Sequence, residues 1–174
     1  MRLFIALEFN DKTKDNICNL QAKLKSNGIY GNYSLRQNLH MTLAFIGEVD
    51  AKTQKLIINA IKDIQYHKFD MQINSFGSFS KVLYLNVKDG KNAIEIANIV
   101  REKLDVCGVE YDKKQFKPHI TILREQSIPA NIKLESFNNS FPIEINNIEK
   151  VVLYESTRIN GKLTYLEKYS IKLR

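Results

Sequence analysis

Two stretches of the sequence decide the predicted fold: Asn38-Leu39-His40-Met41-Thr42-Leu43-Ala44-Phe45-Ile46-Gly47 and Phe116-Lys117-Pro118-His119-Ile120-Thr121-Ile122-Leu123-Arg124. Each contains a histidine and a threonine two positions apart, with an apolar residue after each of them. Side chains at positions i and i+2 of a β-strand share one face. Each stretch therefore predicts a strand that presents an imidazole beside a hydroxyl on one face and packs its apolar residues into a core on the other.

The spacing of the two motifs suggests two related halves. The distance along the chain from His40 to His119 is close to half of the 174 residues. A strand, a helix and the first motif strand are expected in the first half, and a helix followed by the second motif strand in the second half. No sequence repeat is strong enough to prove a duplication, but the spacing is what a duplicated lobe would give.

Apolar periodicity around the motifs predicts a fold of mixed helices and strands. Helices are expected over 11–27, 50–65 and 92–107, and strands over 2–9, 39–46, 69–75, 82–87, 119–123, 141–145, 151–154 and 163–171. The third and fourth strands are expected to form a hairpin with its turn near 78–81. Such hairpins favour a largely antiparallel α+β arrangement over a doubly wound parallel sheet.

Composition indicates one ordinary globular domain over residues 1–174. Hydrophobic residues make up 44% of the chain and charged residues 26%, and only seven Gly and three Pro are available for linkers. These proportions exclude disordered, collagen-like and fibrous proteins. The net charge of +7 favours association with polyanions such as nucleic acids or nucleotides.

Neither a disulfide nor a membrane anchor is expected. Cys18 and Cys107 form no CxxC motif and fall in two predicted helices, which favours two buried, reduced thiols. No apolar run is long enough to span a membrane, and Glu8 interrupts the N-terminal apolar run too early for a signal peptide. We therefore expect a cytoplasmic protein without membrane association.

Two histidines facing one cleft suit a reaction that removes one proton and delivers another near neutral pH. Cleavage of a phosphodiester through a ribose is such a reaction, and the hydroxyls of Thr42 and Thr121 suit hydrogen bonding to the phosphate oxygens. Zinc binding is the competing use of two histidines, but no further ligands stand at a recognised spacing. Serine or cysteine nucleophiles are less favoured, because no G-x-S-x-G motif is present. The third histidine, His67, is expected in a loop.

These motifs, together with Arg2-Leu3-Phe4-Ile5-Ala6-Leu7 and Val152-Leu153-Tyr154-Glu155-Ser156, resemble the two-histidine (2H) phosphoesterase superfamily, and within it the bacterial RNA 2′,3′-cyclic phosphodiesterase branch, also called 2′,5′ RNA ligase. The resemblance implies a bilobal, pseudo-twofold α+β fold, in which two mostly antiparallel sheets flank a central cleft and helices lie outside. It also implies hydrolysis of RNA 2′,3′-cyclic phosphate ends to 2′-phosphates, without metal or other cofactor.

The resemblance further implies roles for individual residues. His40 would be the proton donor and His119 the proton acceptor, while Thr42, Thr121 and Arg124 would bind the substrate phosphate. Strand alternation alone places Arg124 on the face opposite His119, so a bend is needed to bring it to the site. The same alternation favours a core position for Phe45. Tyr33 and Tyr154 are open between base stacking and a structural role.

Three alternatives stay open at this stage. The chain is either an enzyme or a non-catalytic module that binds RNA ends, and the substrate of an enzyme is either RNA or another cyclic phosphate. The same two proton carriers also permit the reverse reaction, which forms a 2′,5′ linkage. A monomer is the default expectation.

Overall fold

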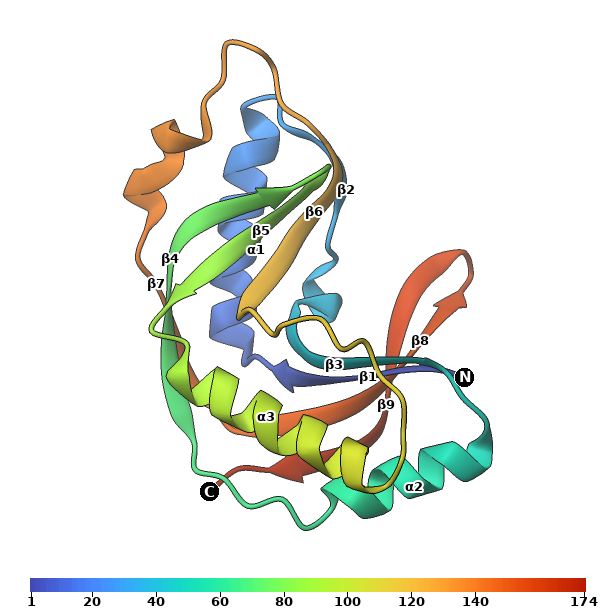
Figure 1. Cartoon of the computed structure of the whole chain (residues 1–174). Helices are drawn as coiled ribbons and strands as arrows, with labels where there is room; N and C mark the ends of the chain where they lie inside the picture. The colour runs from blue at the N-terminus through green and yellow to red at the C-terminus, as the bar shows by residue number, and fades with distance from the viewer.

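The computed structural model describes residues 1–174 and contains three α-helices, two 3-10 helices and nine β-strands (Figure 1). The helices are α1 (Asp11–Ser26), η1 (Arg36–Asn38), α2 (Ala51–Ile61), α3 (Lys91–Val106) and η2 (Leu134–Ser140). The strands are β1 (Arg2–Glu8), β2 (Tyr30–Tyr33), β3 (His40–Glu48), β4 (Phe69–Phe79), β5 (Val82–Lys88), β6 (His119–Ser127), β7 (Ile143–Ile148), β8 (Lys150–Ile159) and β9 (Lys162–Lys172).

The strands form two sheets in which every pairing is antiparallel. The four-stranded sheet has the order β3-β1-β8-β9, and the five-stranded sheet has the order β2-β6-β5-β4-β7. In Figure 1 the five-stranded sheet stands upright above the four-stranded sheet. The predicted α+β class with two antiparallel sheets is confirmed.

The two halves of the chain repeat one unit of structure. The starts of β1 and β5, of α1 and α3, and of β3 and β6 are separated by nearly the same offset, a little under half of the chain. In both halves the first strand pairs with the motif strand, so the order β3-β1-β8-β9 corresponds to β6-β5-β4-β7, with β2 added beside β6. This correspondence is the structural basis of the predicted pseudo-twofold arrangement.

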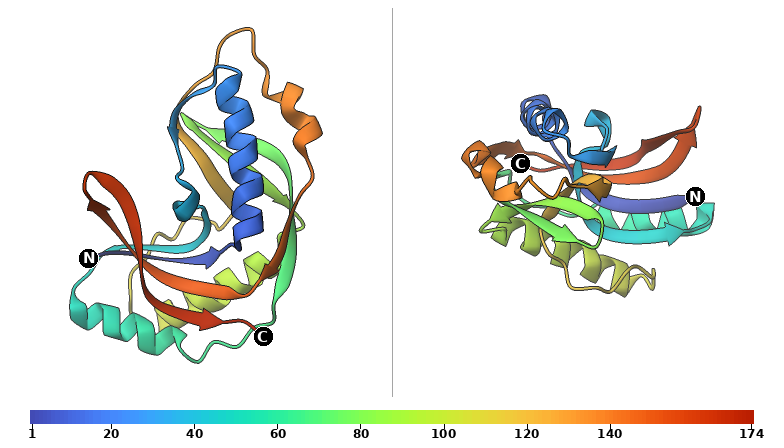
Figure 2. Two further views of the ribbon diagram at one scale, coloured as in Figure 1. Left: turned by 180° about the vertical axis from the view of Figure 1, so that it is seen from behind. Right: turned by 90° about the horizontal axis from the view of Figure 1, so that it is seen from above.

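Each repeated helix packs on the sheet of the other half. α1 follows β1 of the four-stranded sheet but contacts β7, whereas α3 follows β5 of the five-stranded sheet but contacts β3. The two helices consequently lie on opposite outer sides of the molecule (Figure 2). This exchange interleaves the halves, and the buried apolar residues of both sheets form one cluster of 37 residues.

The motif strands place their apolar residues as the alternation predicts. Met41, Leu43, Ile120 and Ile122 are fully buried. Burial of such side chains stabilises the fold by about 2 kcal/mol each. The core therefore fixes the backbone of both motif strands.

Three expectations about local structure are corrected. The second predicted helix ends at Ile61 because the Ile64 amide bonds to the Ile61 carbonyl, a tighter turn that carries Ile64 into the core. β4 runs to Phe79, so the hairpin turn is shorter than expected. Cys18 and Cys107 are free thiols, but both are half-buried rather than buried.

Candidate active site

The first motif holds the His40 ring in one orientation through two hydrogen bonds. Its Nδ1 lies 2.6 Å from the Asn38 carbonyl oxygen and its Nε2 lies 2.8 Å from Thr42 Oγ1. A carbonyl oxygen only accepts, so Nδ1 carries the proton. In the neutral ring Nε2 then accepts from the threonine hydroxyl, which makes Nε2 the nitrogen available for chemistry.

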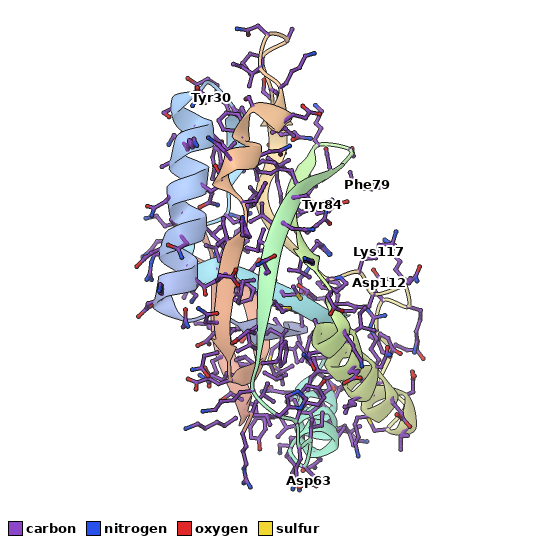
Figure 3. The ribbon with its side chains drawn as sticks, turned by 90° about the vertical axis from the view of Figure 1, so that its left-hand side faces the viewer. Tyr30, Asp63, Phe79, Tyr84, Asp112 and Lys117 are labelled. Carbon is purple, nitrogen blue, oxygen red and sulfur yellow. The ribbon has the colours of Figure 1, made fainter.

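The second motif repeats this arrangement at its histidine. His119 Nδ1 donates to the Lys117 carbonyl oxygen at 2.6 Å, again the carbonyl two residues earlier in the chain. Lys117 and Tyr84, a neighbour of the His119 ring, lie on the side of the five-stranded sheet away from α1 (Figure 3). Both motifs thus direct a ring Nε2 away from the backbone that anchors Nδ1.

A β-bulge follows the threonine of each motif. β3 has one extra residue, Leu43, between its pairings Thr42↔Ala6 and Ala44↔Ile5. β6 has one extra residue, Ile122, between Thr121↔Tyr84 and Leu123↔Leu83. An extra residue re-aims the side chains that follow it, so alternation resumes on the other face.

The bulges decide where Arg124 and Phe45 point. The bulge at Ile122 returns Arg124 to the face of His119 and Thr121, which supplies the bend that the sequence left open. The equivalent bulge at Leu43 brings Phe45 to the face of His40, where it is half-buried with the Arg2 guanidinium 5.0 Å from its ring centre. The prediction that Phe45 packs in the core is wrong for this reason.

Arg124 and His119 lie close enough to His40 for their charges to act on its ring. The pKa of His40 is lowered to about 4, mainly because its ring is buried, and further by the positive charges of Arg124, His119 and Lys14. The bond to the Asn38 carbonyl acts in the opposite direction. The residue as a whole is half-buried and so still reaches solvent. Burial raises the pKa of Tyr165, the ring beside His40, and the charge of Arg124 partly opposes that rise.

Aromatic side chains surround His40, and sequence analysis did not single them out as site residues. Phe4 from β1 lies 5.0 Å from the His40 ring and Tyr165 from β9 lies 5.3 Å from it, measured between ring centres. Tyr154 stacks on Phe4 and donates to Glu8, so its role here is structural. His119 has one such neighbour, Tyr84, at 5.3 Å. Phe4 and Tyr84 are each the third residue of a repeated strand. The spacing between the two halves of the sequence could therefore have related these two aromatic residues.

Two polar residues before the first motif have structural contacts. Asn38 is buried, and its side chain donates to the Leu163 carbonyl in β9 at 2.9 Å. This bond ties the carbonyl that anchors His40 to the β8–β9 hairpin. Tyr33 donates to the Ile29 carbonyl and packs against the core, which favours its structural interpretation.

Other candidate features lie outside this site. His67 is in the loop between α2 and β4, as predicted, and stacks on Tyr66. A cavity of about 780 Å³ is lined by residues that include Tyr66, His67 and Arg174 and by no motif residue. The structure brings no three His, Cys, Asp or Glu residues together in an arrangement suited to a metal ion. The site is accordingly identified by its convergent acid–base groups and not by cavity size.

The arrangement supports proton transfer at two points of one bound group. Each ring has its Nδ1 bonded to a backbone carbonyl, so its Nε2 is the nitrogen left for proton transfer, and each has a threonine two residues along the same strand. Arg124 adds a fixed positive charge, which suits an anionic ligand. An anion between the motifs would meet two imidazoles, two hydroxyls and a guanidinium.

This fold, with one H-x-T-x strand from each half, defines a two-histidine phosphoesterase. The sequence profile of the 2′-5′ RNA ligase superfamily matches residues 13–160, and the chain belongs to this family. No helix of the structure is both long and apolar enough to cross a membrane.

Two related RNA 2′,3′-cyclic phosphodiesterases align with nearly the whole chain. The chain is 29% identical to the RNA 2′,3′-cyclic phosphodiesterase of Methanocaldococcus jannaschii, over 90% of this chain and 92% of the relative. It is 28% identical to the Escherichia coli protein of the same name, over 94% and 92%. The crystal structure of E. coli LigT complexed with 3′-AMP superposes with a TM-score of 0.80 at 26% identity, covering 99% of this chain and 96% of LigT.

Proposed function

We propose that this protein hydrolyses the 2′,3′-cyclic phosphate at the end of an RNA to a 2′-phosphate, by general acid–base catalysis with two histidines. The observation that carries the proposal is the pairing of two matched half-sites, each with its ring anchored at Nδ1 and Nε2 left for chemistry. Family membership and the names of the relatives support the same reaction. The net charge of +7 suits a polyanionic substrate.

In the proposed reaction His119 Nε2 accepts a proton from water as the water oxygen attacks phosphorus. The bond between phosphorus and the 3′ oxygen breaks, and His40 Nε2 donates a proton to that oxygen. The phosphate stays on the 2′ oxygen. Thr42, Thr121 and Arg124 hold the non-bridging oxygens, which carry the negative charge of the transition state.

Substrate binding is proposed to make His40 take up, from the solvent, the proton that it then donates. Burial and neighbouring positive charges lower the pKa of His40 to about 4 in the free protein, so its ring is neutral at pH 7. A bound phosphate brings a negative charge to the same place and favours the imidazolium form. His40 therefore takes up its proton together with the anion.

We propose that one copy of the chain suffices for this activity in the cytoplasm, since both motifs come from the same chain. The reverse reaction, joining ends through a 2′,5′ linkage, uses the same two groups with exchanged roles. Hydrolysis prevails in dilute solution because water is in large excess.

The test is to incubate the purified protein, in excess EDTA, with a short RNA that ends in a 2′,3′-cyclic phosphate, and to locate the product phosphate by chromatography and mass spectrometry. A 2′-phosphate product supports the proposal. Tight binding without product would instead support an RNA-end binding module. Absence of both would direct the search to a cyclic phosphate that is not RNA.

A further inference from the structure

The extra residue in each β-bulge presents its carbonyl oxygen to a helix side chain. Arg101 Nε of α3 donates to the Leu43 carbonyl at 3.0 Å, and Gln21 Nε2 of α1 donates to the Ile122 carbonyl at 3.0 Å. Leu43 and Ile122 are the residues directly after Thr42 and Thr121. Both motif strands are therefore held by a polar side chain at the point where they bulge.

Gln21 and Arg101 occupy the same place in the two halves. Each stands ten residues beyond the first residue of a 16-residue helix, Asp11 in α1 and Lys91 in α3. The offset between them is therefore the one that relates α1 to α3 and β1 to β5. The side chains differ chemically, but both donate to the carbonyl at the equivalent bulge.

Each of the two side chains also binds the segment that leads into the other motif. Gln21, which holds the second motif, donates as well to the Ser34 carbonyl, six residues before His40, at 3.0 Å. Arg101, which holds the first motif, donates to the Lys114 carbonyl, five residues before His119, at 2.8 Å. The Arg101 guanidinium also lies over the ring of Phe116, 5.7 Å from its centre.

Neither position is a free surface group. Gln21 is 8% exposed, and Arg101 is half-buried between β3 and the segment before β6. A buried amide needs its hydrogen bonds satisfied, and here both bonds go to the two motif regions. A glutamine or arginine in such a place holds separate backbone segments at a fixed distance.

We propose that Gln21 and Arg101 are positioning residues, a twofold-related pair of cross-braces that sets the separation and orientation of His40 relative to His119. This inference rests on the proposed function, because that reaction needs the acid and the base on opposite sides of one phosphorus atom. A misplacement of about 1 Å in such a geometry costs on the order of a hundredfold in rate. Neither residue touches the substrate.

The first test compares kinetics of Arg101→Met and Gln21→Met on a 2′,3′-cyclic nucleotide. Gln21→Met keeps the length of the side chain, Arg101→Met keeps its unbranched stem but shortens it, and both variants lose the donors. We expect kcat per folded molecule to fall by at least about tenfold while KM changes less than about threefold. The double variant should lose less than the product of the two single losses, because both braces hold one separation.

Matched controls separate positioning from general loss of a polar side chain. Gln72→Met removes a half-buried glutamine that bonds to Glu144, and Arg158→Met removes an arginine that bonds to a backbone carbonyl in the β8–β9 hairpin. Neither should change kcat by more than about twofold. Arg101→Gln, which places the side chain of the equivalent position at 101, should recover part of the kcat that Arg101→Met loses.

A second readout does not need turnover and keeps the test valid if the proposed reaction is wrong. The chain has three histidines, so ring NMR signals resolve His40, His119 and, as an internal reference, His67. In Arg101→Met we expect the signals of both His40 and His119 to move while His67 stays. Should that variant not fold, Arg101→Lys, which keeps the charge but not the fork of donors, serves in its place. The inference would be overturned if the NMR signal of only one motif histidine moved, or of neither. It would also be overturned if kcat were unchanged in both Arg101→Met and Gln21→Met.

Discussion

The two half-sites share their backbone construction and differ in their surroundings. Both anchor Nδ1 on the carbonyl two residues earlier, and both bulge after the threonine. His40, however, is enclosed by Phe4 and Tyr165 and bonds to Thr42, whereas His119 has Tyr84 beside it. Burial and neighbouring charge lower the pKa of His40 to about 4. One construction thus supports two rings in unequal surroundings, and in the free protein burial favours the neutral form of His40.

The register of the repeated strands produces part of this difference. Thr42 pairs with Ala6 of β1, whereas Thr121 pairs with Tyr84 of β5, the counterpart of Phe4. A shift of two residues keeps each side chain on its face but changes which neighbour stands opposite. The halves are therefore similar in fold and unequal in chemistry.

Replacing the histidines gives the largest expected effect. His40→Asn and His119→Asn should each lower kcat by about a thousandfold, because each removes one partner of a concerted proton transfer. The double variant should be little slower than either single variant. His67→Asn is the matched control and should retain wild-type turnover. Multiplicative losses in the double variant would show that the two rings act independently.

Removing the positive charge of Arg124, in the second half-site, gives the second largest expected effect. Arg124→Met should lower kcat/KM by about a hundredfold, because a charge-assisted contact to the phosphate is lost. Initial rates at low substrate measure this effect. Arg158→Met, which removes a positive charge from the exposed β8–β9 hairpin, should leave the rate nearly unchanged on a cyclic nucleotide. Equal losses in the two variants would mean that Arg124 acts only through the net charge.

The two threonines should be unequal. Thr42→Val removes both a proposed phosphate contact and the hydroxyl bonded to His40 Nε2, and we expect a loss of about thirtyfold in kcat/KM. Thr121→Val removes the phosphate contact and should cost about tenfold or less. Thr42→Ser should restore most of the activity. If Thr121→Val is the more damaging change, the hydroxyl bonded to His40 is not part of the site's function.

The lowered pKa of His40 also predicts the smallest effect, on stability. In the unfolded chain the pKa is about 6.5, so between that pH and about 4 the unfolded state binds more protons than the folded state. The free energy of unfolding should fall as pH decreases through this window, by up to about 2 kcal/mol between pH 7 and pH 5. Urea titrations of wild type and His40→Asn measure it. A wild-type pH dependence that persists in His40→Asn would assign it to other groups.

Alternation of apolar residues was sufficient to predict most strands and the burial of the apolar side of both motif strands. It failed where the backbone departs from regular pairing. β2 has four residues and no buried side chain, so it leaves no pattern. The bulges at Leu43 and Ile122 are invisible in the sequence, which is why Phe45 was misplaced and Arg124 needed a bend.

The contacts around the motifs were also beyond sequence reasoning. Gln21 and Arg101 reach carbonyls of strands distant in the chain, and Tyr165 meets His40 only because β9 joins the sheet of β3 through β8 and β1. Such contacts depend on the order of strands in a sheet. The sequence indicates which strands exist and does not specify that order.

The most direct test of the central claim, that two unequal histidines form one acid–base pair, is the pH dependence of single-turnover rates on an RNA 2′,3′-cyclic phosphate. The wild-type rate should rise and then fall with pH, since His119 must be unprotonated and His40 protonated. His119→Asn should retain only the falling limb, and His40→Asn only the rising limb. Exchanged limbs would reverse the two roles, and a bell-shaped profile that survives in both variants would contradict the two-histidine mechanism itself.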